Sequence, residues 1–164
     1  MPQAVEHGAA VLVVDDRYVI GSRSGPVILT EHMKVDVHEL IRDRNICVVT
    51  VRDTRKALSA LSAAFFDHPA ERMKMIGITG TNGKTTTAFL TAGILQEAGY
   101  RVGMIGTIES YDGRRRETVK NTTPESCEIH RLLFRMVENE CDCCVMEVSS
   151  QGIASVSYTH LRAH

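Results

Sequence analysis

Residues 75–87 read Met-Ile-Gly-Ile-Thr-Gly-Thr-Asn-Gly-Lys-Thr-Thr-Thr, and this stretch decides how the chain is organised. Its mostly apolar start leads into a loop with two glycines, and apolar residues at helical spacing follow the loop. The order predicts a strand, a tight loop and a helix N-terminus, whose backbone N–H groups can bind phosphate. Lys84 supplies a positive charge for the outer phosphates, and the Thr85 hydroxyl can bind Mg²⁺.

The loop departs from the usual phosphate-loop pattern at one position. That pattern has a glycine five residues before Gly83, where this chain has Ile78, and Gly80 lies inside the loop instead. A chance Gly-Lys-Thr at a strand–helix turn is the alternative. We predict that nucleotide phosphates bind at Gly80, Thr81, Asn82, Gly83, Lys84, Thr85 and Thr86.

The composition is that of a globular protein with one domain or slightly more. The chain has 164 residues, of which 43% are hydrophobic and 24% are charged, and its formal net charge is −1. This charge gives no electrostatic reason to expect nucleic acid as a partner. No apolar run reaches the roughly 18 residues of a membrane span, and the N-terminus lacks a signal-peptide pattern. We therefore expect no membrane insertion and a cytoplasmic location.

The five cysteines, an odd number, do not have the pattern of a disulfide framework. Three of them cluster at Cys141, Cys143 and Cys144, and neighbouring residues of a strand point to opposite faces of a sheet. We expect reduced thiols that pack within a strand. A zinc site, the alternative, would need further ligands at suitable spacing.

Two strands and a helix are predicted before the loop. Residues 9–14 form a short apolar run typical of a buried strand, and residues 46–51 also predict a strand. A helix is predicted to begin at Asp53 and to end before Pro69, where we place a domain junction. Its expected buried face consists of Ala57, Leu58, Leu61, Ala64 and Phe65.

A helix and a second strand are predicted after the loop. Residues 84–98 carry a broad apolar stripe, at Ala88, Leu90, Ala92, Ile94 and Leu95, and Gly99 is the expected stop. Residues 100–108 predict a strand, so the fold class is α/β with a parallel sheet. The three arginines at 114–116 either grip phosphates or lie on a solvated hairpin edge, which is the commoner arrangement.

Residues 121–125, Asn-Thr-Thr-Pro-Glu, predict the start of another helix. Thr123 is the expected N-cap, and Glu125 is expected in the first turn. The side chains of Asn121 and Thr122 lie just outside this N-terminus, at a place where ligands often bind. Helix capping alone explains the stretch equally well.

Residues 143–150 predict an apolar strand that presents Glu147 near its carboxyl end. Downstream of a phosphate loop, such an acid is placed to hold Mg²⁺ against nucleotide phosphates. A solvated carboxylate on an edge strand is the alternative. Lys84 and Glu147 are thus the candidate catalytic residues, and Thr85 and Glu147 are the candidate metal ligands.

Residues 80–86, 121–124 and 146–151 together resemble the Mur ligases, ATP-dependent enzymes that form amide bonds in peptidoglycan precursor synthesis. Within this family the chain is similar to the MurE type, which adds the third stem-peptide residue to UDP-MurNAc-L-Ala-D-Glu. The first stretch is shared with sister ligases and folylpolyglutamate synthetases, and the other two narrow the resemblance. It implies the first half of a central ATP-binding domain over residues 70–152, after a remnant of a small α/β uridine-binding domain over residues 1–69.

The resemblance also implies roles for individual residues. Lys84 would hold the phosphates of ATP, and Thr85 and Glu147 would coordinate Mg²⁺. The UDP-MurNAc-dipeptide would contact Asn121, Thr122, Thr123, Ser149 and Gln151. The implied chemistry transfers the γ-phosphoryl group to the substrate carboxylate, and the amine of diaminopimelate or lysine then attacks the acyl phosphate.

The family continues well beyond Gly152, with a modified lysine at the metal site and a C-terminal domain that selects the amino acid. We therefore expect a truncated piece of such a ligase, without ligase activity by itself, and a non-native tail over residues 153–164. Residues 15–45 also match the family poorly. Two other interpretations stay open, a self-contained P-loop ATPase or phosphotransferase and a non-catalytic nucleotide-binding module.

Overall fold

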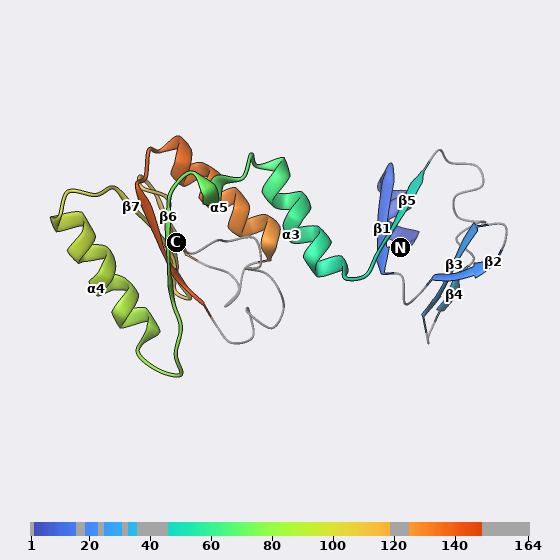
Figure 1. Ribbon diagram of the computed structural model, residues 1–164, viewed down its shortest axis with the longest axis horizontal. Coiled ribbons are helices and arrows are strands. Elements are labelled where there is room, and N and C mark those ends of the chain that lie inside the picture. The colour runs from blue at the N-terminus through green and yellow to red at the C-terminus, as the bar shows by residue number, and fades with distance from the viewer. Residues whose placement is uncertain are drawn as a thin grey trace. The chain divides into compact units, whose positions relative to one another are not determined.

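The computed structural model describes residues 2–15, 19–22, 25–30, 33–35, 46–118 and 125–148 (Figure 1). The chain divides into two compact units, Met1–Ala57 and Leu58–His164. The division falls within helix α3 (Thr54–Phe65), ahead of the predicted junction near Pro69. The assignment of residues 1–69, 70–152 and 153–164 to separate parts stays a prediction.

The first unit contains two small sheets. Helix α1 (Pro2–Glu6) precedes β1 (Val11–Asp15), which pairs in parallel with β5 (Cys47–Val51) around the buried side chains of Leu12 and Val14. Strands β2 (Val19–Ser22), β3 (Gly25–Thr30) and β4 (Met33–Val35) form an antiparallel sheet. Both strands predicted at residues 9–14 and 46–51 are confirmed.

The second unit is built on a five-stranded sheet in the order β6-β10-β7-β8-β9. Strands β6 (Lys74–Ile78), β10 (Cys143–Glu147) and β7 (Val102–Ile105) run parallel. Strands β8 (Glu109–Tyr111) and β9 (Arg116–Thr118) continue the sheet as an antiparallel hairpin. The predicted α/β class with a parallel sheet is confirmed, although β10 separates β6 from β7.

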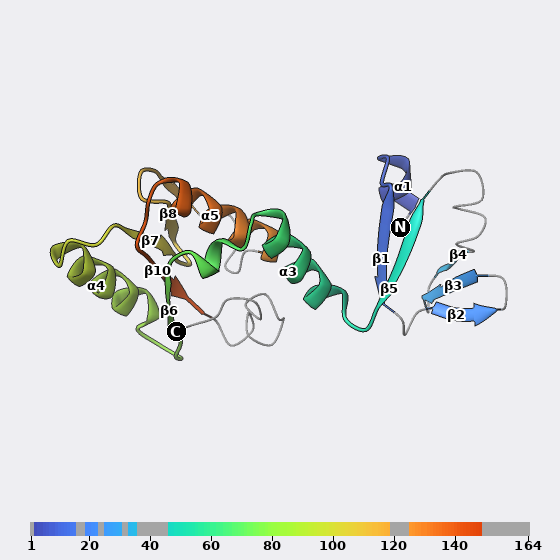
Figure 2. The same cartoon turned by 45° about the horizontal axis from the view of Figure 1, so that its top comes forward.

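Helices cover both faces of this sheet (Figure 2). Helix α4 (Lys84–Glu97) packs Ala88 and Ala92 against Val102, Cys143 and Val145 on one face. Helix α5 (Ser126–Glu138) packs on the other face, and the 3₁₀ helix η2 (Pro69–Glu71) contacts it. The core on this second face is Ala70, Met73, Met75, Ile105, Ile129, Leu132, Leu133, Met136, Cys141, Cys144 and Met146. The sheet is thus clamped between two apolar layers.

The cysteines of β10 alternate between these layers, as the strand geometry predicts. Cys143 belongs to the layer under α4, and Cys144 belongs to the layer under α5. Burial raises the pKa of both thiols, and it raises the pKa of Cys141 to about 11. All five cysteines are free, and the three clustered ones are buried, so the prediction of reduced, packed thiols is confirmed for Cys143 and Cys144 of β10. Cys141 is buried just before the strand.

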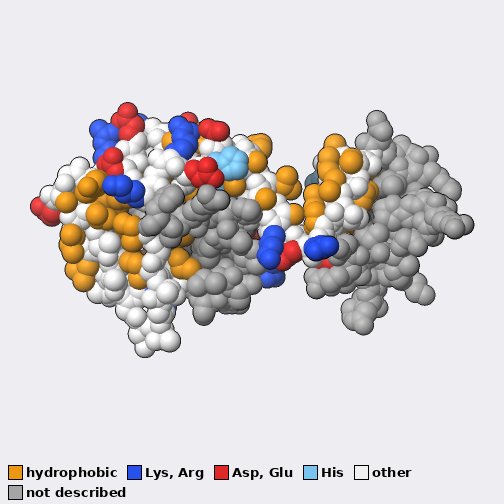
Figure 3. Space-filling model, viewed as in Figure 1, with side chains coloured by type: hydrophobic (Ala, Val, Ile, Leu, Met, Phe, Trp, Pro, Cys, Tyr) orange, Lys and Arg blue, Asp and Glu red, His pale blue; other side chains and the backbone are white. Residues whose placement is uncertain are grey.

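The buried faces of the helices agree only in part with the predictions. Ala88 and Ala92 of α4 are buried, whereas Leu90 and Ile94 are 63% and 70% exposed, and hydrophobic side chains gather over this helix in Figure 3. The predicted face of α3 is wrong, because Leu58, Leu61 and Phe65 are exposed while Ser59, Ser62 and Ala63 are buried. Apolar periodicity ignores side-chain size, and α3 buries its small residues.

Helix α5 begins later than predicted. Glu125 has an extended backbone (φ −70°, ψ 160°) and precedes the helix, so its predicted place in the first turn is wrong. Residues 121–124, with the predicted N-cap Thr123, lie outside the described residues. One face of the helix is apolar and packs into the core, since Ile129, Leu132, Leu133 and Met136 are all buried.

A buried aspartate ties the β8–β9 hairpin to α5. The backbone N–H groups of Arg114 and Arg115 donate to Asp112 Oδ1 at 2.9 and 2.7 Å, and the Arg135 guanidinium of α5 pairs with Oδ2. Burial alone would raise the pKa of Asp112, but these donors and the charge of Arg135 bring it below the ordinary value. The arginine run therefore lies at an exposed hairpin edge, as its commoner interpretation predicts.

The Asp112→Asn substitution is expected to lower the free energy of unfolding at neutral pH by about 1–3 kcal/mol, because it removes charged hydrogen bonds. A carboxyl whose pKa is lowered by folding stabilises the protein above its unfolded pKa of 3.8 and loses that contribution as the pH falls through the folded pKa. Urea unfolding should therefore show a difference between wild type and variant that shrinks below about pH 4. A difference that persists unchanged in acid would contradict this role of Asp112.

Two glycines provide a matched pair for testing the packing of the sheet. A Cβ on Gly103 of β7 would lie 2.8 Å from Cγ of the buried Met136, whereas a Cβ on Gly93 of α4 meets no atom within 4 Å among the described residues. Gly103→Ala should lower the free energy of unfolding by about 1–3 kcal/mol through overpacking. Gly93→Ala should raise it by about 0.4–1 kcal/mol. Equal effects in urea unfolding would contradict the close approach of α5 to β7.

Candidate functional site

The loop between β6 and α4 has the geometry of a phosphate cradle. Gly80 and Gly83 have φ values of 150° and 76°, which residues other than glycine rarely adopt. Gly83 is the N-cap of α4, and no side chain of the described residues caps the helix there. The first-turn N–H groups and the positive end of the helix dipole are therefore available to an anion.

Lys84 folds back over this loop. Its Nζ donates to the carbonyl oxygen of Gly80 at 2.7 Å and lies 3.4 Å from that of Thr81. The ammonium group therefore lies at the loop, and its present partners are neutral carbonyl groups. Phosphate oxygens would be stronger partners, because hydrogen bonds between two charged groups are about twice as strong as neutral ones.

The structure brings Thr85 and Glu147 together, although 62 residues separate them in the chain. Thr85 Oγ1 donates to Glu147 Oε2 at 3.0 Å. Glu147 is the last residue of β10, and it pairs in register with Ile78, the last residue of β6. Because the carboxyl ends of parallel strands lie on the same side of a sheet, the acid and the loop meet there. Glu147 is 7% exposed and lies in a central strand, which excludes the alternative of a solvated edge carboxylate.

Two further residues at this edge were not found from the sequence. The N–H of Thr107 donates to Glu147 Oε1 at 3.2 Å, and a Cβ on Gly106 would lie 2.9 Å from the same oxygen. Both residues follow the end of β7, the other neighbour of β10. A Gly-Thr pair directly after a parallel strand is a recognisable signal. It was missed because the strand was expected to run on to Ile108, beyond both residues.

The donor set suits a magnesium ion. A carboxylate and a hydroxyl are oxygen ligands of the kind that Mg²⁺ prefers, and this ion usually takes its other ligands from water and substrate phosphates. The described residues contain no cluster of three or more His, Cys, Asp or Glu side chains that could hold a metal ion. Thr85 and Glu147, beside an uncapped helix N-terminus, therefore fit a metal that is shared with a bound phosphate.

The remaining predicted site residues fall into two groups. Thr81, Asn82 and Thr86 are exposed at the loop. The predicted substrate contacts lie outside the described residues, and these are Asn121, Thr122, Thr123, Ser149 and Gln151.

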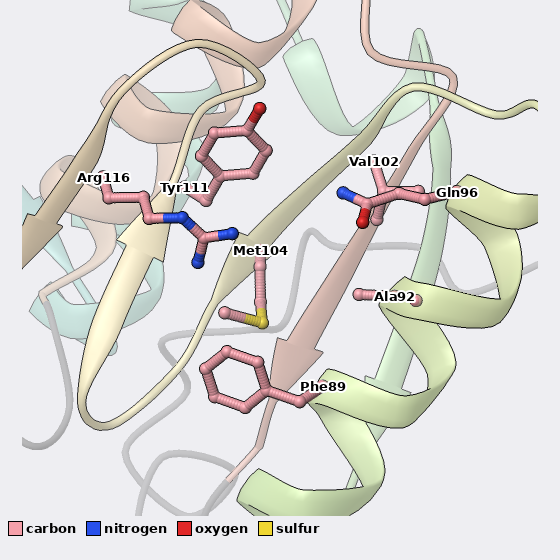
Figure 4. Close-up of a pocket in the computed structure, with 8 residues that line it drawn as sticks. Phe89, Ala92, Gln96, Val102, Met104, Tyr111 and Arg116 are labelled. Carbon is pink, nitrogen blue, oxygen red and sulfur yellow. The ribbon is translucent and has the colours of Figure 1, made fainter.

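A small hollow lies between α4 and the β8–β9 hairpin (Figure 4). Phe89, Met104 and Arg116 border it, and the Arg116 guanidinium lies 4.8 Å from the centre of the Tyr111 ring. Its volume of about 70 Å³ is well below the several hundred Å³ of an ordinary ligand pocket. We assign no ligand to it.

Comparison with known families agrees with the geometry of the loop and the acid. The family described as the Mur ligase middle domain matches residues 78–163, slightly more than half of the chain. The chain belongs to the Mur ligase family. The match begins at the last residue of β6 and includes Lys84, Thr85, Thr107 and Glu147. It also includes most of the stretch predicted to be a non-native tail, and that assignment stays a prediction.

Relatives of known name point to one type within this Mur ligase family. A protein of Clostridium perfringens named UDP-N-acetylmuramoyl-L-alanyl-D-glutamate–2,6-diaminopimelate ligase is 44% identical over 142 residues, covering 85% of this chain and 28% of that protein. A ligase of the same name, numbered 1, from Clostridium acetobutylicum is 48% identical over 109 residues, covering 66% and 23%. This chain thus spans about a quarter of the length of these Mur ligases.

A solved structure supports the fold of this Mur ligase chain. The structure of a UDP-N-acetylmuramoyl-L-alanyl-D-glutamate–2,6-diaminopimelate ligase superimposes with a TM-score of 0.56 and 20% sequence identity, covering 69% of this chain and 23% of the other. At this identity the likeness concerns the fold alone.

No helix within the described residues is long and apolar enough to cross a membrane.

Proposed function

We propose that this chain is the ATP-binding part of a ligase that joins diaminopimelate to UDP-MurNAc-L-Ala-D-Glu. The observation that carries the proposal is the hydrogen bond from Thr85 to Glu147 beside the Lys84 loop, at the carboxyl ends of the parallel strands, an arrangement that suits a metal ion and a phosphate. The printed names of the relatives supply the substrates. The chain spans about a quarter of their length, so the ligase reaction is proposed for the whole protein.

Residues of the loop bind and orient the phosphates of ATP in this proposal. The N–H groups of residues 80–86 surround the phosphate oxygens, and Lys84 exchanges its contact with the Gly80 carbonyl for a phosphate oxygen. Thr85 and Glu147 hold Mg²⁺, which neutralises charge on the phosphates when it is bound. Phosphoryl transfer needs this positioning and charge neutralisation more than it needs a nucleophilic side chain.

The proposed reaction has two steps. The substrate carboxylate attacks the γ-phosphorus of ATP, so an acyl phosphate forms and ADP leaves. The amine of diaminopimelate then attacks the acyl carbon, an amide bond forms, and phosphate leaves with the bonding electrons of the broken C–O bond and takes up the proton that the amine loses. The proposed contacts of the UDP-MurNAc substrate are Asn121, Thr122, Thr123, Ser149 and Gln151.

The proposed location is the cytoplasm, and the free cysteines are consistent with it.

The binding of ATP to the purified 164-residue chain, measured by calorimetry at a series of Mg²⁺ concentrations, tests the site. Lys84→Ala should weaken binding about 10- to 100-fold, since it removes charged hydrogen bonds to phosphate. Glu147→Gln should abolish the dependence of binding on Mg²⁺. Lys56→Ala, which removes an exposed lysine of α3, is the matched control and should bind like wild type.

Binding by Lys84→Ala that equals wild type would overturn the proposed site. The same preparation separates the two other interpretations of the sequence. Steady Mg²⁺-dependent ATP hydrolysis that Lys84→Ala abolishes would favour a self-contained ATPase. Binding without turnover, and with no amide product from the full set of substrates, is what we expect of this chain by itself.

A further inference from the structure

Glu147 is held on two sides, and only one of them belongs to the phosphate loop. On the loop side, Thr85 Oγ1 donates to Oε2 at 3.0 Å. On the β7 side, the N–H of Thr107 donates to Oε1 at 3.2 Å, and the Thr107 hydroxyl lies 3.5 Å from both carboxylate oxygens. The two oxygens therefore have different partners, one from the loop and one from the turn after β7.

Gly106 makes room for this arrangement. A Cβ at this position would lie 2.9 Å from Glu147 Oε1 and 3.2 Å from the carbonyl oxygen of Glu109, both closer than side-chain atoms normally come. The Glu109 carbonyl accepts a hydrogen bond from the Gly106 N–H at 3.0 Å, so the backbone of this turn is fixed. Since the φ of Gly106 lies outside the left-handed region, the need for glycine here is steric.

We propose that the turn formed by Gly106 and Thr107 is a positioning element for Glu147, which holds Oε1 so that Oε2 faces Thr85 and can coordinate Mg²⁺. This inference rests on the proposed function of the site. A glutamate side chain has three rotatable bonds, and a carboxylate fixed through one oxygen loses little further freedom when the other binds a metal. Substitution of a group that hydrogen-bonds to a metal ligand typically changes metal affinity about 10- to 100-fold.

A purely structural explanation is the alternative, because any buried carboxylate needs hydrogen-bond donors. The two roles differ in what a substitution changes. A structural partner affects the stability of the metal-free chain and the binding of ATP with and without Mg²⁺ together. Loss of a positioning partner changes the Mg²⁺ midpoint, which is the Mg²⁺ concentration at which the enhancement of ATP binding is half complete. It leaves metal-free ATP binding unchanged, because the loop and Lys84 provide that binding.

The test measures this Mg²⁺ midpoint by ATP-binding calorimetry, together with metal-free ATP binding and the melting temperature in EDTA, on the 164-residue chain. Thr107→Val removes the hydroxyl but keeps the side-chain shape, and Thr107→Ser restores the hydroxyl. Gly106→Ala pushes the carboxylate away from its present place. The controls are Thr118→Val on β9, two strands from β7, and Gly93→Ala, whose new Cβ meets no described atom within 4 Å.

We expect Thr107→Val and Gly106→Ala to raise the midpoint about 10-fold or more. Metal-free ATP binding should be unchanged, and Thr107→Ser should approach the wild-type midpoint. Both controls should keep the wild-type midpoint and the wild-type metal-free binding. Wild-type midpoints in both variants would overturn the inference, and so would an equal loss of metal-free and metal-dependent binding. If Glu147→Gln also keeps the wild-type midpoint, the proposed function itself fails. A lost or shifted midpoint in Glu147→Gln, with wild-type midpoints in the two turn variants, refutes the positioning role alone.

Discussion

The burial of the Glu147 carboxylate among the ends of three parallel strands is the constraint on which the site depends. A charged group that is 7% exposed is costly unless donors surround it, and here they come from the residues after β6 and after β7. Removing one donor leaves a charge that the rest of the site must still satisfy. The carboxylate therefore links the phosphate loop to the β7 turn, and a metal bound to it would affect the hydrogen bonds of both segments.

The packing of the sheet keeps these strand ends in register. Strand β10 lies between β6 and β7, and its side chains alternate between an apolar layer under α4 and another under α5. A shift of β10 by one residue would move Cys143 and Val145 to the opposite layer and would turn Glu147 away from Thr85. The two cores thus fix the position of the acid, and the Asp112–Arg135 pair fixes the hairpin that continues from the β7 turn.

Local signals in the sequence predicted the parts of the site, and non-local packing decided the rest. The phosphate loop, the stop at Gly99 and the acid after an apolar strand all follow from residues adjacent in the chain, and the structure confirms their geometry. The insertion of β10 between β6 and β7 and the contact of Thr107 with Glu147 join residues about 40 to 70 positions apart, which no local pattern encodes. Helical periodicity likewise predicted the apolar residues of α4 and α3 without predicting which of them are buried.

The most direct test of this account is a crystal structure of the chain with Mg²⁺ and a non-hydrolysable ATP analogue. The account predicts a metal about 2.1 Å from Thr85 Oγ1, with Glu147 Oε2 as a ligand either directly or through one metal-bound water. It also predicts that Lys84 Nζ has left the Gly80 carbonyl for a phosphate oxygen and that Thr107 still donates to Oε1. A metal bound elsewhere, with the Thr85–Glu147 hydrogen bond intact, would contradict it.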